Sequence, residues 1–160
     1  MGVFLLYSEQ LSERKRRISP SLWVLPVGLV VKLKKYFVLF TTGALGYAAL
    51  ELLWRAYTHW SMMLAGGVCF ALISLICKWF AKAPIAVKAI ACGIGITAVE
   101  LGFGALFNLH LGMSVWDYSR QPFNLWGQIC PAYSALWVGI SLLLIPVAEA
   151  INESYDLKAK

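Results

Sequence analysis

Charged residues are scarce in this sequence. Only 14% of its 160 residues are Asp, Glu, Lys or Arg, whereas about a quarter are charged in a typical soluble domain. Hydrophobic residues make up 60% of the chain, and the mean hydropathy is +0.70. This composition excludes an ordinary soluble domain and is typical of a protein embedded in a lipid bilayer.

Motifs for nucleotide, metal and nucleophile chemistry are also missing. The sequence contains no phosphate-binding G-x-x-x-x-G-K-[ST] loop, no H-E-x-x-H and no G-x-S-x-G. We therefore expect no cofactor and no metal site, and any ATPase that works with this protein must be a separate chain. No C-x-x-C motif occurs, so we expect the cysteines to be small buried hydrophobic residues: Cys69, Cys77, Cys92 and Cys130.

Four segments are long and apolar enough to cross a bilayer as helices. They cover residues 36–56, 62–80, 85–107 and 130–150. We predict an all-α, polytopic membrane protein, in which these segments form a four-transmembrane-helix bundle with an aromatic extracytoplasmic loop. The chain then divides into a basic N-terminal segment at the membrane interface (1–35), a transmembrane domain (36–150) and a cytoplasmic tail (151–160).

Basic residues predict the orientation of the bundle. Twelve of the 14 Lys and Arg residues lie on the side that holds both termini and the connection between the second and third spans. Only Arg55 and Arg120 lie on the other side. Because Lys and Arg collect on the cytoplasmic side, we predict a multi-pass protein of the cell membrane with both termini cytoplasmic. The net charge of +6 then reflects topology, and we expect no nucleic-acid partner.

Two glutamates, Glu51 and Glu100, lie inside the first and third predicted spans at similar depth. A carboxylate in hydrocarbon is costly, so an intramembrane acid indicates a functional site. Arg55 and His59 follow Glu51 at steps of four, which places them on one helical face, and Asn108 follows Glu100 on the third span. We predict that the two glutamates approach each other and that Arg55 bonds at least one of them.

The loop before the fourth span, residues 108–129, mixes aromatic and polar residues. We expect it to fold back onto the bundle as a lid. It contributes five candidates for ligand binding or proton relay: Trp116, Asp117, Tyr118, Asn124 and Gln128. We predict an outward-facing polar pocket lined by Glu51, Arg55, His59, Glu100, Asn108 and Asp117.

The loop also carries a specific string of residues: Trp116-Asp117-Tyr118-Ser119, then Pro122, Asn124, Gly127 and Ile129-Cys130. With Glu51 and Glu100 upstream, this string resembles the family labelled putative ABC-transporter type IV, whose members are also called CmpB-like proteins or ABC transporter permeases. The resemblance covers residues 36–145. It implies a permease-like membrane protein and brings no established substrate or catalytic residue.

Three functions remain open. A permease-like protein would bind or pass a small polar or amphiphilic ligand, and because four helices are few for a translocation path, it would need a homodimer, a separate ATPase or another partner subunit. A membrane-embedded enzyme would act on a lipid-type substrate, with the glutamates and His59 as acid and base. A structural accessory subunit would hold a fully paired polar cluster without a cavity.

Overall fold

The computed structural model describes residues 26–158 and is helical over most of that range. Its helices are α2 (Val27–Arg55), α3 (Trp60–Trp79), α4 (Ile85–Phe103), the π-helical segment η2 (Gly104–His110) and α5 (Pro131–Lys158). Counting η2 with α4, four helices in the described part of the chain are long and apolar enough to cross a membrane. The predicted all-α bundle of four membrane-spanning helices is confirmed.

The helices extend beyond the predicted spans at both ends of the chain. Helix α2 begins at Val27, so residues 27–35, which we expected at the membrane interface, form its first turns. The rest of that expected interfacial segment lies outside the described residues. Helix α5 continues to Lys158, so most of the expected tail is helical. With 29 residues, α2 is about 43 Å long, which exceeds the ~30 Å hydrocarbon core.

The connections from α2 to α3 and from α3 to α4 are short, and local contacts define where each helix ends and the next begins. Helix α2 ends where Ala56 takes a left-handed conformation (φ 60°) and donates its N–H to the Leu52 carbonyl. His59 then caps α3, because its ring nitrogen accepts the N–H of Ser61. Pro84 precedes α4, and its fixed φ suits the start of a helix.

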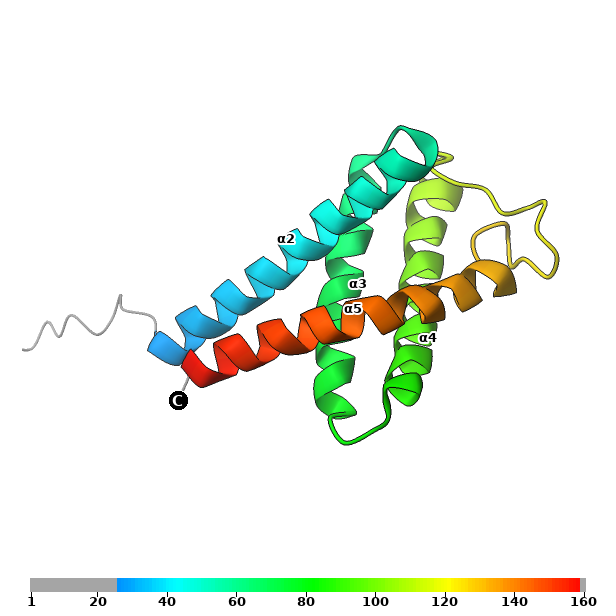
Figure 1. Ribbon diagram of the computed structural model, residues 1–160. Helices are drawn as coiled ribbons and strands as arrows, with labels where there is room; N and C mark the ends of the chain where they lie inside the picture. Colours follow the sequence, from blue (N-terminus) through cyan, green and yellow to red (C-terminus); the bar gives the residue numbers. More distant parts are fainter. Residues whose placement is uncertain (1–25, 159–160) are drawn as a thin grey trace, which may run out of the picture.

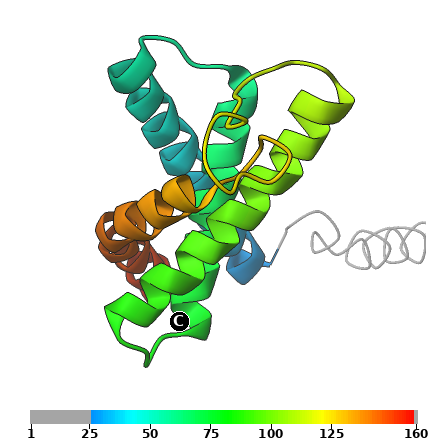
Figure 2. The ribbon, with the colours of Figure 1, turned by 90° about the vertical axis from the view of Figure 1, so that its right-hand side faces the viewer.

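The helices form an open, splayed bundle (Figure 1). Helices α3 and α4 run antiparallel, α2 packs along α3, and α5 crosses both α3 and α4. The C-terminal end of α5 returns to the N-terminal end of α2. The aromatic loop, residues 111–130, lies at the far end of α5, and Figure 2 views the bundle from the side of this loop.

Glycines allow α2 and α3 to approach closely. A Cβ built on Gly66 would lie 2.7 Å from the Gly43 carbonyl oxygen and would overlap the Cβ of Tyr47. Small residues at such crossings let two membrane helices bring their backbones together, which is how helices associate without a hydrophobic driving force. The close contact between α2 and α3 therefore depends on the absence of a side chain at Gly43 and Gly66.

Two apolar clusters fill the bundle. The larger draws residues from all four helices, and the smaller lies beneath the loop around Phe107 and Trp116. Three cysteines are buried, Cys69 is half-buried, and all four are free thiols, as expected for small hydrophobic residues. The larger cluster consists of Leu39, Phe70, Ile73, Ile76, Cys77, Ala89, Cys92, Ile96, Ile145 and Ala148.

Helix α5 carries a polar face near its C-terminal end. Glu149, Asn152 and Asp156 are spaced by three and four residues and so share one side of the helix. Lys88 of α4, only 8% exposed, donates to Glu149 at 2.6 Å. Ser74 of α3 donates to the Asn152 side chain at 2.7 Å. Two of the three residues thus bind α5 to different neighbours.

Asp156 completes this polar face by joining α5 to two more lysines. It accepts from Lys35 of α2 at 3.3 Å and from Lys78 of α3 at 2.9 Å. Lys35 is buried although it is charged, so its ammonium depends on this partner. Together, the three polar residues of α5 fasten it to each of the other helices. Pro146, which has no N–H to donate to the Leu142 carbonyl, lies just before this face.

Candidate functional site

Glu51 lies near the C-terminal end of α2 and is 8% exposed. Arg55, one turn further along, forms an ion pair with its Oε1. The Thr58 hydroxyl donates to Oε2 at 2.5 Å. Both carboxylate oxygens are therefore occupied by donors from α2 and the turn that follows it, and the charge of Glu51 is neutralised locally.

Arg55 also connects α2 to the loop. Its Nη1 donates to the Val115 carbonyl at 3.3 Å, and its guanidinium lies 4.5 Å above the centroid of the Tyr57 ring. Its Nε is buried without a hydrogen-bond partner among the described residues. The side chain that neutralises Glu51 therefore also holds the start of the aromatic loop against the bundle.

Glu100, in α4, is 7% exposed and has a different environment. The Tyr118 hydroxyl donates to Oε1 at 2.9 Å, and the Trp137 indole N–H donates to Oε2 at 3.1 Å. These donors come from the loop and from α5, so Glu100 joins three elements. Within residues 26–158, no Lys, Arg or His forms an ion pair with it.

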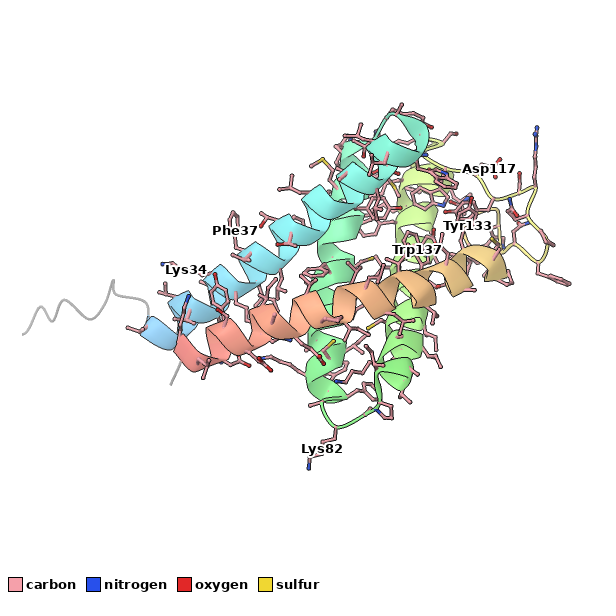
Figure 3. All side chains as sticks on the ribbon, viewed as in Figure 1. Lys34, Phe37, Lys82, Asp117, Tyr133 and Trp137 are labelled. Carbon is pink, nitrogen blue, oxygen red and sulfur yellow. The ribbon has the colours of Figure 1, made fainter. Side chains whose placement is uncertain are left out.

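Two aromatic side chains contact Glu100, and a third stacks on one of them. Tyr118 stacks on Tyr133 of α5, with ring centroids 4.3 Å apart and planes 10° from parallel. Figure 3 shows Tyr133 and Trp137 near the end of α5 that faces the loop. Burial, together with the charge of Glu100, raises the pKa of the Tyr118 phenol well above its usual range. Tyr118 therefore remains protonated and available as a hydrogen-bond donor.

The two glutamates belong to separate hydrogen-bonded groups. Arg55 bonds Glu51, as their four-residue spacing suggests, and in the described part of the chain no hydrogen bond or shared cation links Glu51 to Glu100. Tyr47 lies one turn before Glu51 on α2, and its ring centroid is 6.0 Å from that of Trp137, which donates to Glu100. The groups are thus neighbours around Tyr47, and a shared ligand role stays a prediction.

His59 serves as the cap of α3. Its Nδ1 lies 2.7 Å from the Ser61 hydroxyl and 3.3 Å from the Ser61 nitrogen, and its ring packs on Trp60. Because α2 ends at Arg55, His59 does not continue the helical face of Glu51. Across residues 26–158, no three His, Cys, Asp or Glu side chains gather closely enough to hold a metal ion.

Asn108 fastens the loop to the end of η2. Its side-chain oxygen accepts the Val115 N–H at 2.7 Å, and its amide donates to the Trp116 carbonyl at 3.0 Å. The same amide donates to the Gln128 side chain at 2.8 Å. One half-buried asparagine therefore joins both ends of the loop.

Gln128 and Trp116 close this arrangement. The Trp116 indole N–H donates to the Gln128 carbonyl at 3.0 Å, and both residues are buried. The Gln128 amide donates to the Trp126 carbonyl at 3.0 Å. The loop thus folds onto the bundle, and its polar side chains bond largely to the backbone of the loop itself.

Asp117 and Asn124 shape the exposed tip of the loop. Asp117 accepts the N–H and the hydroxyl of Ser119, at 2.8 and 2.9 Å, and these hydrogen bonds hold the pKa of its carboxyl below the usual value. Asn124 bonds the carbonyls of Ser119 and Gln121 and accepts the Gly127 N–H. Both side chains stabilise turns within the loop, and neither forms a hydrogen bond with Glu100.

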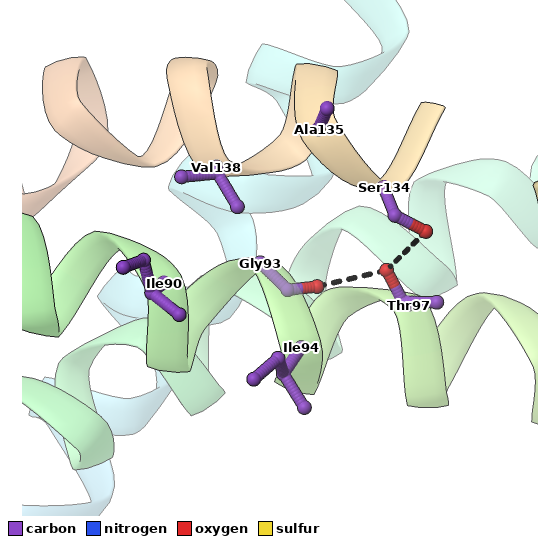
Figure 4. A pocket seen from close by; sticks show the side chains of 7 residues that line it. All are labelled: Ile90, Gly93, Ile94, Thr97, Ser134, Ala135 and Val138. Carbon is purple, nitrogen blue, oxygen red and sulfur yellow. Dashed lines mark hydrogen bonds between the residues drawn. The ribbon is translucent and has the colours of Figure 1, made fainter. Parts of the chain in front are cut away.

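Two surface grooves lie elsewhere. The first, of about 290 Å³, runs between α4 and α5, where Thr97 donates to Gly93 and Ser134 (Figure 4). The second, of about 540 Å³, lies between α2 and α5. Neither groove is lined by residues of the predicted outward-facing pocket.

Several site residues were not predicted from the sequence. Thr58 and Trp137 complete the bonds of Glu51 and Glu100, and no local pattern marks either of them. The polar face of α5 was recognisable, because its three residues repeat at helical spacing: Glu149, Asn152 and Asp156.

Comparison with known families gives one match. The family model described as Putative ABC-transporter type IV matches residues 36–158. No curated protein matches the chain, and no solved structure does. The match includes both glutamates, the aromatic loop and the polar face of α5.

Proposed function

This chain belongs to the Putative ABC-transporter type IV family, and we propose that it is the membrane-embedded, permease-like subunit of a transport system. In this proposal, Glu100 is the residue that binds the ligand. The observation that carries this proposal is the environment of Glu100. It is a buried acid inside a membrane-spanning helix, and its bonding partners are two neutral donors. An ionisable residue inside a membrane-spanning helix is costly and indicates a functional role by default.

The ligand class follows from what surrounds Glu100. A carboxylate can accept hydrogen bonds or pair with a cationic group, and aromatic faces attract cations and apolar groups. Tyr118 and Trp137 bond Glu100 directly, and the ring of Tyr133 stacks on that of Tyr118. These features support a small polar or amphiphilic ligand, with a donor or cationic group directed at Glu100.

Access to Glu100 requires movement of the loop, because Tyr118 belongs to it. The loop is held by the bonds of Val115 to Arg55 and Asn108. These are exchangeable polar contacts near the outer surface. We place the entry for the ligand here, with the loop as a lid whose opening removes the Tyr118 donor from Glu100.

A separate ATPase subunit belongs to this proposal, since the sequence has no phosphate-binding loop. A second copy of the chain is an alternative way to build a path, because four helices enclose little space. The polar face of α5 lies at the opposite end from the loop and holds that end of the bundle closed.

A structural accessory subunit is the second candidate. It is favoured by the pairing of Glu51 with Arg55 and Thr58 and by the bonds among Asn108, Trp116 and Gln128. The enzyme alternative receives less support, because His59 is engaged with Ser61 and bonds neither glutamate.

Glu100→Gln is expected to abolish transport while it preserves the fold. The carboxamide oxygen can accept the Trp137 N–H, and its NH2 can donate to the Tyr118 oxygen, so both contacts survive without an ionisable group. The measurement compares small-molecule contents of cells and medium for a deletion strain that carries the parent gene, the variant or no gene.

Gly102→Ala is the matched control for this experiment, because a Cβ on Gly102 of the same helix meets no atom within 4 Å. It should restore the parent profile, whereas Glu100→Gln should resemble the deletion. Full restoration by Glu100→Gln, with equal protein in the membrane, would favour the accessory subunit. Identical profiles for the parent and the deletion would count against transport itself.

We also propose that both termini face the cytoplasm and that the loop is external, because Lys and Arg crowd the opposite end. A membrane-impermeant thiol reagent applied to intact cells should label Gln121→Cys and spare Lys158→Cys. The parent gives the background, since three of its cysteines are buried and one is half-buried. Labelling in the reverse order would invert the orientation and place the lid in the cytoplasm.

A further inference from the structure

The groove between α2 and α5 combines apolar walls with positive charge. It encloses about 540 Å³ and is lined by Leu33, Lys34, Phe37, Val38 and Tyr155. Leu33 and Phe37 are 54% and 69% exposed, so a large apolar surface is open to the surrounding bilayer.

The lysines of this region divide into two kinds. Lys35 and Lys78 share Asp156. In contrast, Lys34 and Lys158 make no ion pair with any residue between 26 and 158. The region therefore carries more positive charge than its own acid neutralises.

Lys34 and Lys158 flank the same tyrosine. Lys34 lines the groove beside Tyr155, and the Lys158 ammonium lies 5.3 Å from the centroid of the Tyr155 ring. Figure 3 shows Lys34 in the N-terminal half of α2, with Phe37 about one turn further along the helix. Glu153 is exposed on α5, but at two residues from Tyr155 it lies on another face of the helix.

We propose that an anionic phospholipid occupies this groove, with its phosphate held by Lys34 and Lys158 and one acyl chain along Phe37 and Val38. Charge complementarity supplies the head-group contact, and the Tyr155 hydroxyl is a further donor for phosphate oxygens. The apolar walls explain why the occupant is a lipid: a free phosphate would satisfy the lysines and leave Leu33 and Phe37 without a partner. The site binds the ends of α2 and α5 together from the lipid side.

Native mass spectrometry of the full-length protein in detergent tests this site, with phosphatidylglycerol and phosphatidylcholine as probes. The parent should retain one phosphatidylglycerol at concentrations that leave phosphatidylcholine unbound. The double variant Lys34→Gln/Lys158→Gln should bind phosphatidylglycerol more weakly by on the order of tenfold or more, because each lysine near a membrane surface contributes to anionic lipid binding. Because the measurement is made in micelles, it does not depend on the orientation of the protein.

Lys82→Gln is the matched control, since Lys82 lies in the turn between α3 and α4, away from the groove (Figure 3). It removes one positive charge, half of what the double variant removes, and should retain the lipid as the parent does. If Lys82→Gln loses half or more of the binding free energy that the double variant loses, the effect is one of net charge and the site is overturned. If millimolar inorganic phosphate displaces the lipid, the groove is a simple anion site and the lipid proposal is overturned. Equal retention of both lipids by the parent would also overturn it.

Discussion

Replacing Arg55 with alanine is expected to destabilise the folded protein by on the order of 3 kcal/mol. The change leaves Glu51 buried with only the Thr58 hydroxyl as a partner, and it removes the bond to the Val115 carbonyl. The value lies at the low end for a broken buried pair, because the Arg55 side chain is 24% exposed and an orphaned acid can take up a proton. Thermal unfolding in detergent measures the loss.

The double variant Glu51→Gln/Arg55→Ala separates the ion pair from the packing of the arginine. It removes the orphaned charge, so it should be more stable than Arg55→Ala alone. Arg55→Lys should fall between the parent and Arg55→Ala, because it retains the charge but loses the guanidinium geometry that reaches both Glu51 and Val115. An Arg55→Ala protein that unfolds at the temperature of the parent would show that this pair contributes nothing to stability.

Replacing Gly66 with alanine is expected to push α2 and α3 apart. The added methyl would lie 2.7 Å from the Gly43 carbonyl oxygen, and both this atom and the Tyr47 Cβ are fixed to a helix backbone, so they cannot rotate away. Overpacking of this kind costs about 3 kcal/mol, the upper end of the usual range, because a whole helix must move. The expected result is a lower unfolding temperature. In size-exclusion chromatography, a smaller fraction of the protein should elute as the compact form.

Gly46→Ala provides the comparison for Gly66→Ala. Gly46 is in α2, and a Cβ there meets nothing within 4 Å. The same substitution should leave stability unchanged or raise it slightly, because alanine favours helix over glycine by about 1 kcal/mol. Equal behaviour of the two variants would mean that α2 and α3 do not cross in close contact.

Hydropathy was sufficient to predict the four spans but not where the first helix begins. Lys32, Lys34 and Lys35 suggested the end of an interfacial segment, whereas α2 passes through them without a break. The reason is that Lys35 is buried against Asp156, which is 121 residues away in the sequence. A charge can lie in a helix when a distant partner satisfies it, and composition does not reveal that partner.

The candidate site could be predicted where it depends on spacing within one helix, and not where it depends on packing between helices. The pair Glu51 and Arg55 follows from a step of four. Trp137 reaches Glu100 only because α5 crosses α4. His59 shows the limit of periodicity, because the four-residue step holds only while the helix continues, and Ala56 turns the chain away first.

Pro146 has a mechanical consequence for α5. It divides the helix into an upper arm, which reaches Glu100 through Trp137, and a lower arm anchored by Glu149, Asn152 and Asp156. A helix bends most easily where a ladder hydrogen bond is missing, so this proline is a fulcrum between the arms. A bend at Pro146 would change the angle between the part of α5 that contacts Glu100 and the part that is bonded to α2, α3 and α4.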